Sequence, residues 1–243
     1  MTNSRSIYKR LKFYLSINWV KTLRFNFKKL PYAQARKLPV LFYGKVRFQD
    51  ISGKIIIDAP VHFGMIGFGQ RYEKNTVHKG IAEMALGGKV VFKGMAQFSK
   101  DYFVCIERGA SVEFGHMFGL GTEGKIVCTE KMTFGKYVRI ASESRIVDTD
   151  FHQMINTATN EKYPLSAPVT LGDYTYLSNR VSVLKGTITP AYCTVSANSL
   201  CNKDYTALGE NILLGGVPAK LLKEHITRDW KTEELLFDKW MKV

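Results

Sequence analysis

An apolar side chain recurs every six residues through most of the second half of the sequence. The members of this ladder are Phe134, Ile140 and Ile146 and then, after an interruption, Leu171, Leu177, Val183, Thr189, Val195 and Cys201. The position four residues after a ladder position is compact, as in Val138, Ser144, Thr175, Val181, Thr187, Cys193 and Ser199. An α-helix repeats about every 3.6 residues and a strand every two, so neither explains this period. It predicts a solenoid, in which each hexad forms a short strand and a turn and stacks on the next coil.

The stretch from Gly44 to Lys131 contains strand-length apolar pieces separated by glycine or by charged turn residues, such as KIIID, KVVFKG and GKIVCTE. The six-residue rhythm is present there but slips, as between Val104 and Phe114. The pattern therefore predicts an all-β solenoid domain with parallel strands over residues 44–217, and attachments at both of its ends.

The N-terminal segment has a different pattern. Apolar residues at helical spacing predict a short amphipathic helix within residues 4–18, whereas alternation over residues 23–28 predicts a strand. The two prolines that follow leave room for only a short helix between them. Because a solenoid needs its ends covered, residues 1–43 are predicted to form a cap.

The C-terminal segment, residues 218–243, is predicted to be a helical cap. The spacing in LLKEHI is helical, and Thr232 followed by two glutamates predicts the N-cap and first turn of a last helix.

Positive charge is concentrated at the start of the chain. Residues 1–49 contain 12 Lys or Arg and no Asp or Glu, in a chain of formal net charge +14. This segment either packs its aromatic side chains on the main domain and leaves its lysines solvated, or rests on an anionic membrane surface. A nucleic-acid partner is not expected, because no nucleic-acid-binding motif accompanies the charge.

The four cysteines lie far apart and form no CxxC motif. Cys193 and Cys201 fall on inward positions of the hexads, so the cysteines are predicted to be reduced core residues, as is typical of cytoplasmic proteins. No apolar run approaches the roughly 18 residues that a membrane span needs, and the start lacks the apolar centre of a signal peptide. We expect a cytoplasmic protein, with peripheral contact at the inner face of the cell membrane if the basic segment binds lipid.

The ladder is interrupted once, after Asp148 in the sequence DTDFH, by a polar stretch over residues 149–168 that must bulge from the solenoid. Functional residues concentrate on loops of this kind, and histidine has a side-chain pKa suited to proton transfer near neutrality, so His152 is the candidate functional residue. Asp148 and Asp150 either orient the imidazole and contact the substrate or form turns. A metal site of these three residues is not expected, since no second histidine stands at ligand spacing.

The closing hexads VTLGDYTYLSNRVSVLKGTITPAYCTVSANSLCNKD, the GGVPAK that follows them and the loop DTDFHQM resemble the hexapeptide-repeat acyltransferase family. Within it, the chain is most similar to O-acetyltransferases of capsule, O-antigen and exopolysaccharide synthesis. The resemblance implies a left-handed parallel β-helix, a homotrimer and direct acetyl transfer from acetyl-CoA to a saccharide, with His152 as the base. It covers residues 114–223 specifically and the first 113 residues only weakly.

The resemblance also implies binding residues. In the family, coenzyme A lies in a groove between adjacent subunits, which carries over to Ala141, Asn179, Ala197, Asn202, Lys203, Lys220 and Lys223. Tyr176 stands where the family has tryptophan near the acceptor. The family's asparagine oxyanion donor is replaced by the stretch FGLGTEGK, which leaves that donor unassigned.

Other functions fit the same scaffold. An N-acyltransferase would use an amino sugar as the acceptor. A metal-dependent β-helix hydratase of the carbonic anhydrase kind would need three converging histidines. A non-catalytic scaffold would keep the ladder but would not need His152.

Overall fold

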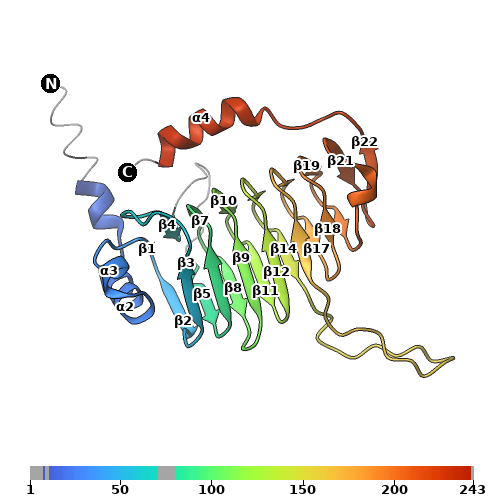
Figure 1. Cartoon of the computed structure of the whole chain (residues 1–243), viewed down its shortest axis with the longest axis horizontal. Coiled ribbons are helices and arrows are strands. Elements are labelled where there is room, and N and C mark those ends of the chain that lie inside the picture. Colours follow the sequence, from blue (N-terminus) through green and yellow to red (C-terminus); the bar gives the residue numbers. More distant parts are fainter. Residues whose placement is uncertain (1–7, 9–10, 71–79, 242–243) are drawn as a thin grey trace.

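The computed structural model of the chain describes residues 8, 11–70 and 80–241. Three sheets of short parallel strands wrap around one long axis, and each coil of the chain contributes a strand to each sheet (Figure 1). The predicted fold class, an all-β solenoid of hexapeptide repeats, is confirmed as a parallel β-helix.

From β1 to β20 the strands follow one another through the three sheets in strict rotation, whereas β21 and β22 both join the first sheet. The first sheet contains β1 (Val40–Phe42), β4 (Ile66–Phe68), β7 (Ala96–Phe98), β10 (Phe118–Leu120), β13 (Arg139–Ile140), β16 (Tyr176–Leu177), β19 (Cys193–Val195), β21 (Ile212–Gly215) and β22 (Lys220–Lys223). The second contains β2 (Val46–Asp50), β5 (Ala82–Leu86), β8 (Phe103–Ile106), β11 (Lys125–Cys128), β14 (Arg145–Val147), β17 (Ser182–Val183) and β20 (Leu200–Cys201). The third contains β3 (Lys54–Ile57), β6 (Lys89–Phe92), β9 (Ser111–Phe114), β12 (Lys131–Phe134), β15 (Val169–Leu171) and β18 (Ile188–Thr189).

The core is the column of ladder side chains that fills the inside of these coils. All nine predicted ladder residues from Phe134 to Cys201 are buried, and so are the seven compact residues between them. Toward the N-terminus the same positions are aromatic: the Phe114 and Phe134 rings stack 5.4 Å apart, and Phe68 stacks on Phe98 at 4.3 Å. Stacked apolar side chains therefore hold each coil on the next, as the hexad pattern predicted.

Coil length explains why the rhythm is clean only near the C-terminus. Leu177 pairs with Val195, one full coil of three hexads later. Earlier coils are longer, since Phe98 pairs with Leu120 and Leu120 with Ile140. The extra residues lie at the corners, where the chain turns between sheets, so the inward positions stay in register while their spacing in the sequence changes.

The N-terminal segment caps the first coil with helices, and the strand predicted over residues 23–28 is wrong. Residues 11–16 are helical, whereas the rest of the helix predicted within residues 4–18 falls largely outside the described residues. Helices α2 (Trp19–Lys29) and α3 (Tyr32–Ala35) follow, the second of them being the short helix expected between the prolines.

Helix α2 replaces the missing neighbour of strand β1. The Asn26 amide donates to the Val40 carbonyl at 2.7 Å and accepts from the Val40 N–H at 3.2 Å. The Thr22 hydroxyl accepts from the Phe42 N–H at 3.1 Å. An exposed sheet edge is a site for unwanted pairing, and here two buried side chains satisfy its backbone groups. This tertiary role explains why the segment is helical despite its alternating pattern.

The C-terminal segment differs from the prediction in two ways. Residues 220–223 form β22, which runs antiparallel to β21, and not the start of a helix. The last helix, α4 (Trp230–Met241), is capped by Asp229, whose carboxylate accepts from the Thr232 N–H at 3.1 Å, so Thr232 is not the N-cap. The parallel strands thus run from β1, which begins at Val40, to β21, which ends at Gly215.

Among the described residues, no helix is both long and apolar enough to cross a membrane.

Candidate active site

The interruption of the ladder is an arm that projects sideways from the solenoid (Figure 1). It leaves the coil after β14 and returns at β15, so it occupies the corner between the second and third sheets. Its two sides run antiparallel and are joined by bridges between Thr149 and Ser166 and between Ile155 and Lys162. The bulge predicted over residues 149–168 is therefore a two-stranded extension.

Asp148 fixes the base of the arm to the preceding coil. Its buried carboxylate accepts from the backbone N–H groups of Thr129, Glu130 and Lys131 at 2.7, 2.9 and 3.1 Å and from the Thr129 hydroxyl at 3.0 Å. Thr129 also bonds the Ser166 hydroxyl at 3.0 Å, on the returning side of the arm. Asp148 thus caps a turn of another coil, which is a structural use and leaves its oxygens no room for substrate.

Asp150 is held from the following coil. The Lys185 ammonium lies 2.5 Å from the Asp150 carboxylate and also donates to the Pro164 carbonyl. Because Asp150 and Pro164 stand on opposite sides of the arm, one lysine clamps both. The Asp150 carboxylate is therefore already paired with a lysine of the same chain.

His152 lies just beyond this clamp. Phe151 adopts the left-handed backbone conformation, with φ +61°, which turns the chain immediately before the histidine. This conformation is unusual for an aromatic residue, and the Phe151 N–H donates to the Thr149 hydroxyl at 3.1 Å. His152 itself is exposed, and within the described part of the chain its imidazole makes no hydrogen bond or ion pair. The anchored foot of the arm thus presents the His152 imidazole with both of its nitrogens open to a partner.

Four of the residues that resemblance assigns to coenzyme A share one corner of the solenoid. Ala141, Asn179 and Ala197 stand on successive coils between the first and second sheets, and the Asn179 carbonyl accepts from the Asn198 N–H at 3.1 Å. Gly215 continues the same row on the last coil, and Lys220 pairs with it. The structure therefore aligns these residues parallel to the solenoid axis.

The remaining assigned residues lie elsewhere. Asn202 and Lys203 follow β20, at the same corner as the arm and one coil beyond Lys185. Lys223 pairs with Leu213 in the first sheet. The residues assigned to coenzyme A binding are thus divided between two corners of the solenoid.

Tyr176 is half-buried on the outer face of the first sheet, under the segment that leads to α4. The Arg228 guanidinium stacks over its ring at 4.1 Å and over Trp230 at 4.8 Å. Arg228 also pairs with Glu233. Neither Arg228 nor Lys185 was found by sequence reasoning, since no local motif marks a contact between residues so far apart in the chain.

The stretch FGLGTEGK offers few free donors for an oxyanion. The N–H groups of Gly119 and Gly121 donate to the Val138 and Ile140 carbonyls at 2.9 and 2.7 Å. The Thr122 hydroxyl is buried and bonded to Ser99 at 2.9 Å. These groups are part of the coil-to-coil bonding, so none of them is free to bind an oxyanion.

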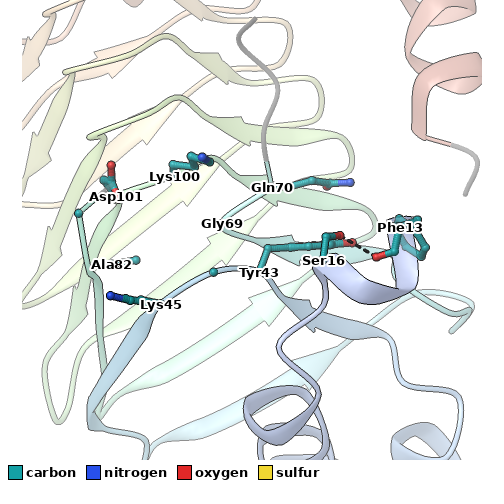
Figure 2. A pocket seen from close by; sticks show the side chains of 11 residues that line it. Phe13, Ser16, Tyr43, Lys45, Gly69, Gln70, Ala82, Lys100 and Asp101 are labelled. Carbon is teal, nitrogen blue, oxygen red and sulfur yellow. Dashed lines mark hydrogen bonds between the residues drawn. The ribbon is translucent and has the colours of Figure 1, made fainter. Parts of the chain in front are cut away.

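A cavity of about 630 Å³ lies at the opposite end of the solenoid, between the N-terminal helical segment and the first coils (Figure 2). Phe13 and Tyr43 line one side of it, and Lys45, Lys100 and Asp101 line the other. None of the predicted site residues borders it. No cluster of three His, Cys, Asp or Glu residues able to hold a metal ion occurs within residues 8, 11–70 and 80–241.

Comparisons with known proteins bear on these features. No family model matches the chain. The Escherichia coli K12 protein WbbJ, named as a "putative lipopolysaccharide biosynthesis O-acetyl transferase", is 31% identical over 116 residues, which are 44% of this chain and 58% of WbbJ. The chain thus matches little more than half the length of this relative.

Among solved structures, the polySia-specific acetyltransferase NeuO is 16% identical over 78% of each chain, with a TM-score of 0.49. The polysialic acid O-acetyltransferase OatWY is 18% identical over 80% of this chain and 98% of its own, with a TM-score of 0.48. The N-acyltransferase AntD from Bacillus cereus, bound to dTDP and 3-hydroxybutyryl-CoA, is 15% identical over 84% of this chain and 89% of its own, with a TM-score of 0.40. The chain is thus similar, over part of its length, to an O-acetyl transferase of lipopolysaccharide biosynthesis, and its three-sided coils of short strands form a parallel β-helix.

Proposed function

We propose that this protein transfers an acetyl group from acetyl-CoA to a hydroxyl of a saccharide, in a surface polysaccharide or its lipid-linked precursor. The observation that carries the proposal is His152, an exposed and unbonded imidazole on an arm that buried Asp148 and the Lys185 clamp hold in place. The match to an O-acetyl transferase of lipopolysaccharide biosynthesis supports the acceptor class.

The chemistry needs one base and no covalent enzyme intermediate. His152 takes the proton of the sugar hydroxyl as its oxygen attacks the thioester carbonyl carbon, since a hydroxyl is a poor nucleophile until its proton is removed. The tetrahedral intermediate then expels the coenzyme A thiolate, which takes up the proton. A positioned base of this kind contributes roughly 10²- to 10⁴-fold in rate.

The site is formed between two chains in this proposal. The row that contains Ala141 and Asn179 lies at one end of the second sheet and the arm at the other, about six residues away along β14. At roughly 3.3 Å per residue the two corners of one chain are on the order of 20 Å apart. An arm that points away from its own row can serve the row of a neighbouring subunit, in keeping with the homotrimer that the resemblance implies.

Lysine side chains provide the phosphate contacts. Lys203, Lys220 and Lys223 are exposed and form no ion pair in the described part of the chain, so they are available as point charges for the phosphates of coenzyme A. The pantetheine arm would then lie along the row of small residues at the adjoining corner.

We place the enzyme in the cytoplasm, at the inner face of the cell membrane. Lipid-linked saccharides are acceptors that stay at that surface, and the basic N-terminal segment is suited to hold the enzyme beside them.

The test is acetyl transfer from labelled acetyl-CoA to a panel of surface glycans that includes amino sugars. His152→Ala should lower transfer by at least 100-fold, in line with the loss of a general base. The matched control is His62→Ala, because His62 is also exposed but lies near the first coil. Acetyl transfer that survives in His152→Ala would contradict the mechanism. If the label appears only on the amino group of the amino sugars, the reaction is N-acylation and not O-acetylation.

A further inference from the structure

The outward side of helix α2 carries an apolar row beside a row that contains two basic residues. A helix has about 3.6 residues per turn, so residues four apart lie nearly in line. One line is Trp19, Leu23 and Phe27, whose exposed fractions are 36%, 44% and 51%. The neighbouring line is Val20, Arg24 and Lys28, also exposed. We call these six residues the α2 face.

The other side of α2 is used by the fold. Thr22, Phe25 and Asn26 are buried against the first coil, and the Phe25 ring lies 5.2 Å from that of Phe42. The cations on that side are engaged as well: Lys21 lies over the Phe48 ring at 4.6 Å and Lys29 donates to the Ser52 carbonyl at 3.3 Å. The stability of the cap therefore explains why the inner residues are apolar or paired, but it does not explain the exposed apolar and basic residues of the α2 face.

Aromatic residues extend the apolar row at both ends. Tyr14 stacks on Trp19, with the ring planes 14° apart, and the Trp19 indole N–H donates to the Tyr14 carbonyl at 3.0 Å. Tyr32, 72% exposed, lies beside Phe27 at the other end. Tryptophan and tyrosine favour the boundary between hydrocarbon and headgroups, because their rings are apolar and their tips polar.

Charge decides which partner this surface fits. Arg24 and Lys28 form no ion pair among the described residues, and the first 49 residues contain no acidic side chain at all. A second copy of the chain would bring like charge to the same surface, which opposes self-association. An anionic bilayer offers what both rows require, an apolar layer under negatively charged headgroups.

We propose that the α2 face docks on an anionic membrane surface, with Trp19, Leu23 and Phe27 inserted at the headgroup boundary and Arg24 and Lys28 on the phosphates. Figure 1 shows α2 at the end of the solenoid opposite the arm, so docking leaves His152 uncovered. The inference deepens the membrane location proposed above by naming the residues that make the contact, and it does not depend on the acyl-transfer reaction, since it rests only on the cap.

The test is flotation of the full chain with vesicles of equal parts phosphatidylglycerol and phosphatidylcholine, at physiological salt. The wild-type protein should float with these vesicles and not with vesicles of phosphatidylcholine alone. Leu23→Glu/Phe27→Glu should abolish flotation. Arg24→Gln/Lys28→Gln should weaken binding by about 10- to 30-fold, from the usual contribution of each basic residue near such a surface.

The matched controls make the same types of substitution at exposed positions outside α2. Leu235→Glu/Leu236→Glu alters two apolar residues on α4 that are 72% and 48% exposed, and Lys89→Gln/Lys125→Gln removes two exposed lysines from the coils. Both should float like the wild type, with circular dichroism showing that every variant is folded. The proposal fails if the wild type does not float, if neutral vesicles bind it equally, or if Leu23→Glu/Phe27→Glu changes oligomeric mass while flotation persists.

Discussion

The Lys185 ammonium lies 2.5 Å from the Asp150 carboxylate, an ion pair that joins the arm to the coil that follows it in space. The lysine side chain is 21% exposed, so the pair is partly screened from water. Together with the bond from Lys185 to Pro164, it sets where the arm leaves the solenoid and hence where His152 stands.

We predict that Lys185→Met impairs catalysis more than it impairs folding. The methionine keeps the length of the side chain but removes the clamp on both sides of the arm, so His152 should lose its fixed position. We expect kcat to fall by at least tenfold while the melting temperature changes by only a few degrees. Hydrogen exchange in residues 149–168 should rise in the same variant.

Lys185→Arg is the informative companion, because it keeps the charge and can still bridge Asp150 and the Pro164 carbonyl. Substantial recovery of kcat by arginine would support a positioning role for Lys185. Equal kcat in Lys185→Met and the wild type would show that the clamp is dispensable.

Asp148→Asn should destabilise the protein by about 1–3 kcal/mol, the usual cost of weakening charge-assisted bonds to a buried group. The asparagine keeps one acceptor oxygen but turns its NH₂ toward backbone N–H groups of the Thr129 turn, which cannot accept. Urea denaturation measures the loss. Asp204→Asn is a suitable control, since Asp204 is exposed and bonds only its neighbour Thr206.

A stability equal to that of the wild type in Asp148→Asn would mean that the carboxylate does not anchor the arm.

Cys105 should be the first thiol to react with a disulfide reagent such as dithionitrobenzoate in the native protein. It is half-buried on the outer side of the second sheet, whereas Cys128, Cys193 and Cys201 are buried. Burial raises the pKa of the Cys193 and Cys201 thiols to about 12, which keeps them in the unreactive neutral form at pH 8. Cys105→Ser should therefore remove the fast phase, and denaturant should expose the other thiols.

A fast phase that survives in Cys105→Ser would show that another cysteine is accessible. Since the prediction of four reduced core cysteines included Cys105, this experiment also tests the one position whose side chain points outward.

Asn26→Leu should cost roughly 2–4 kcal/mol, because the buried N–H and C=O of Val40 lose their partners at the edge of β1. We expect the variant to aggregate during thermal unfolding, since the first sheet would present an uncapped edge. Differential scanning calorimetry and light scattering measure the two effects. Phe27→Leu, an exposed change on the same helix, should alter neither of them.

The hexad ladder fixed the scaffold from sequence alone because each of its contacts repeats along the chain. A coil stacks on the next through residues at equivalent positions, so the spacing of Leu177, Val183 and Thr189 is enough to predict a solenoid of parallel strands. The break in the same ladder located the arm and His152. These are features that a local pattern can encode.

The tertiary structure decided the rest, because the deciding contacts join residues that share no pattern. The alternating residues 23–28 form a helix since Thr22 and Asn26 are needed at the edge of β1. Asp148 and Asp150 could have faced a substrate, but bonds from turns one coil away use them to brace the arm. Sequence thus determined the solenoid and the position of its histidine, and packing between distant segments determined how that histidine is held.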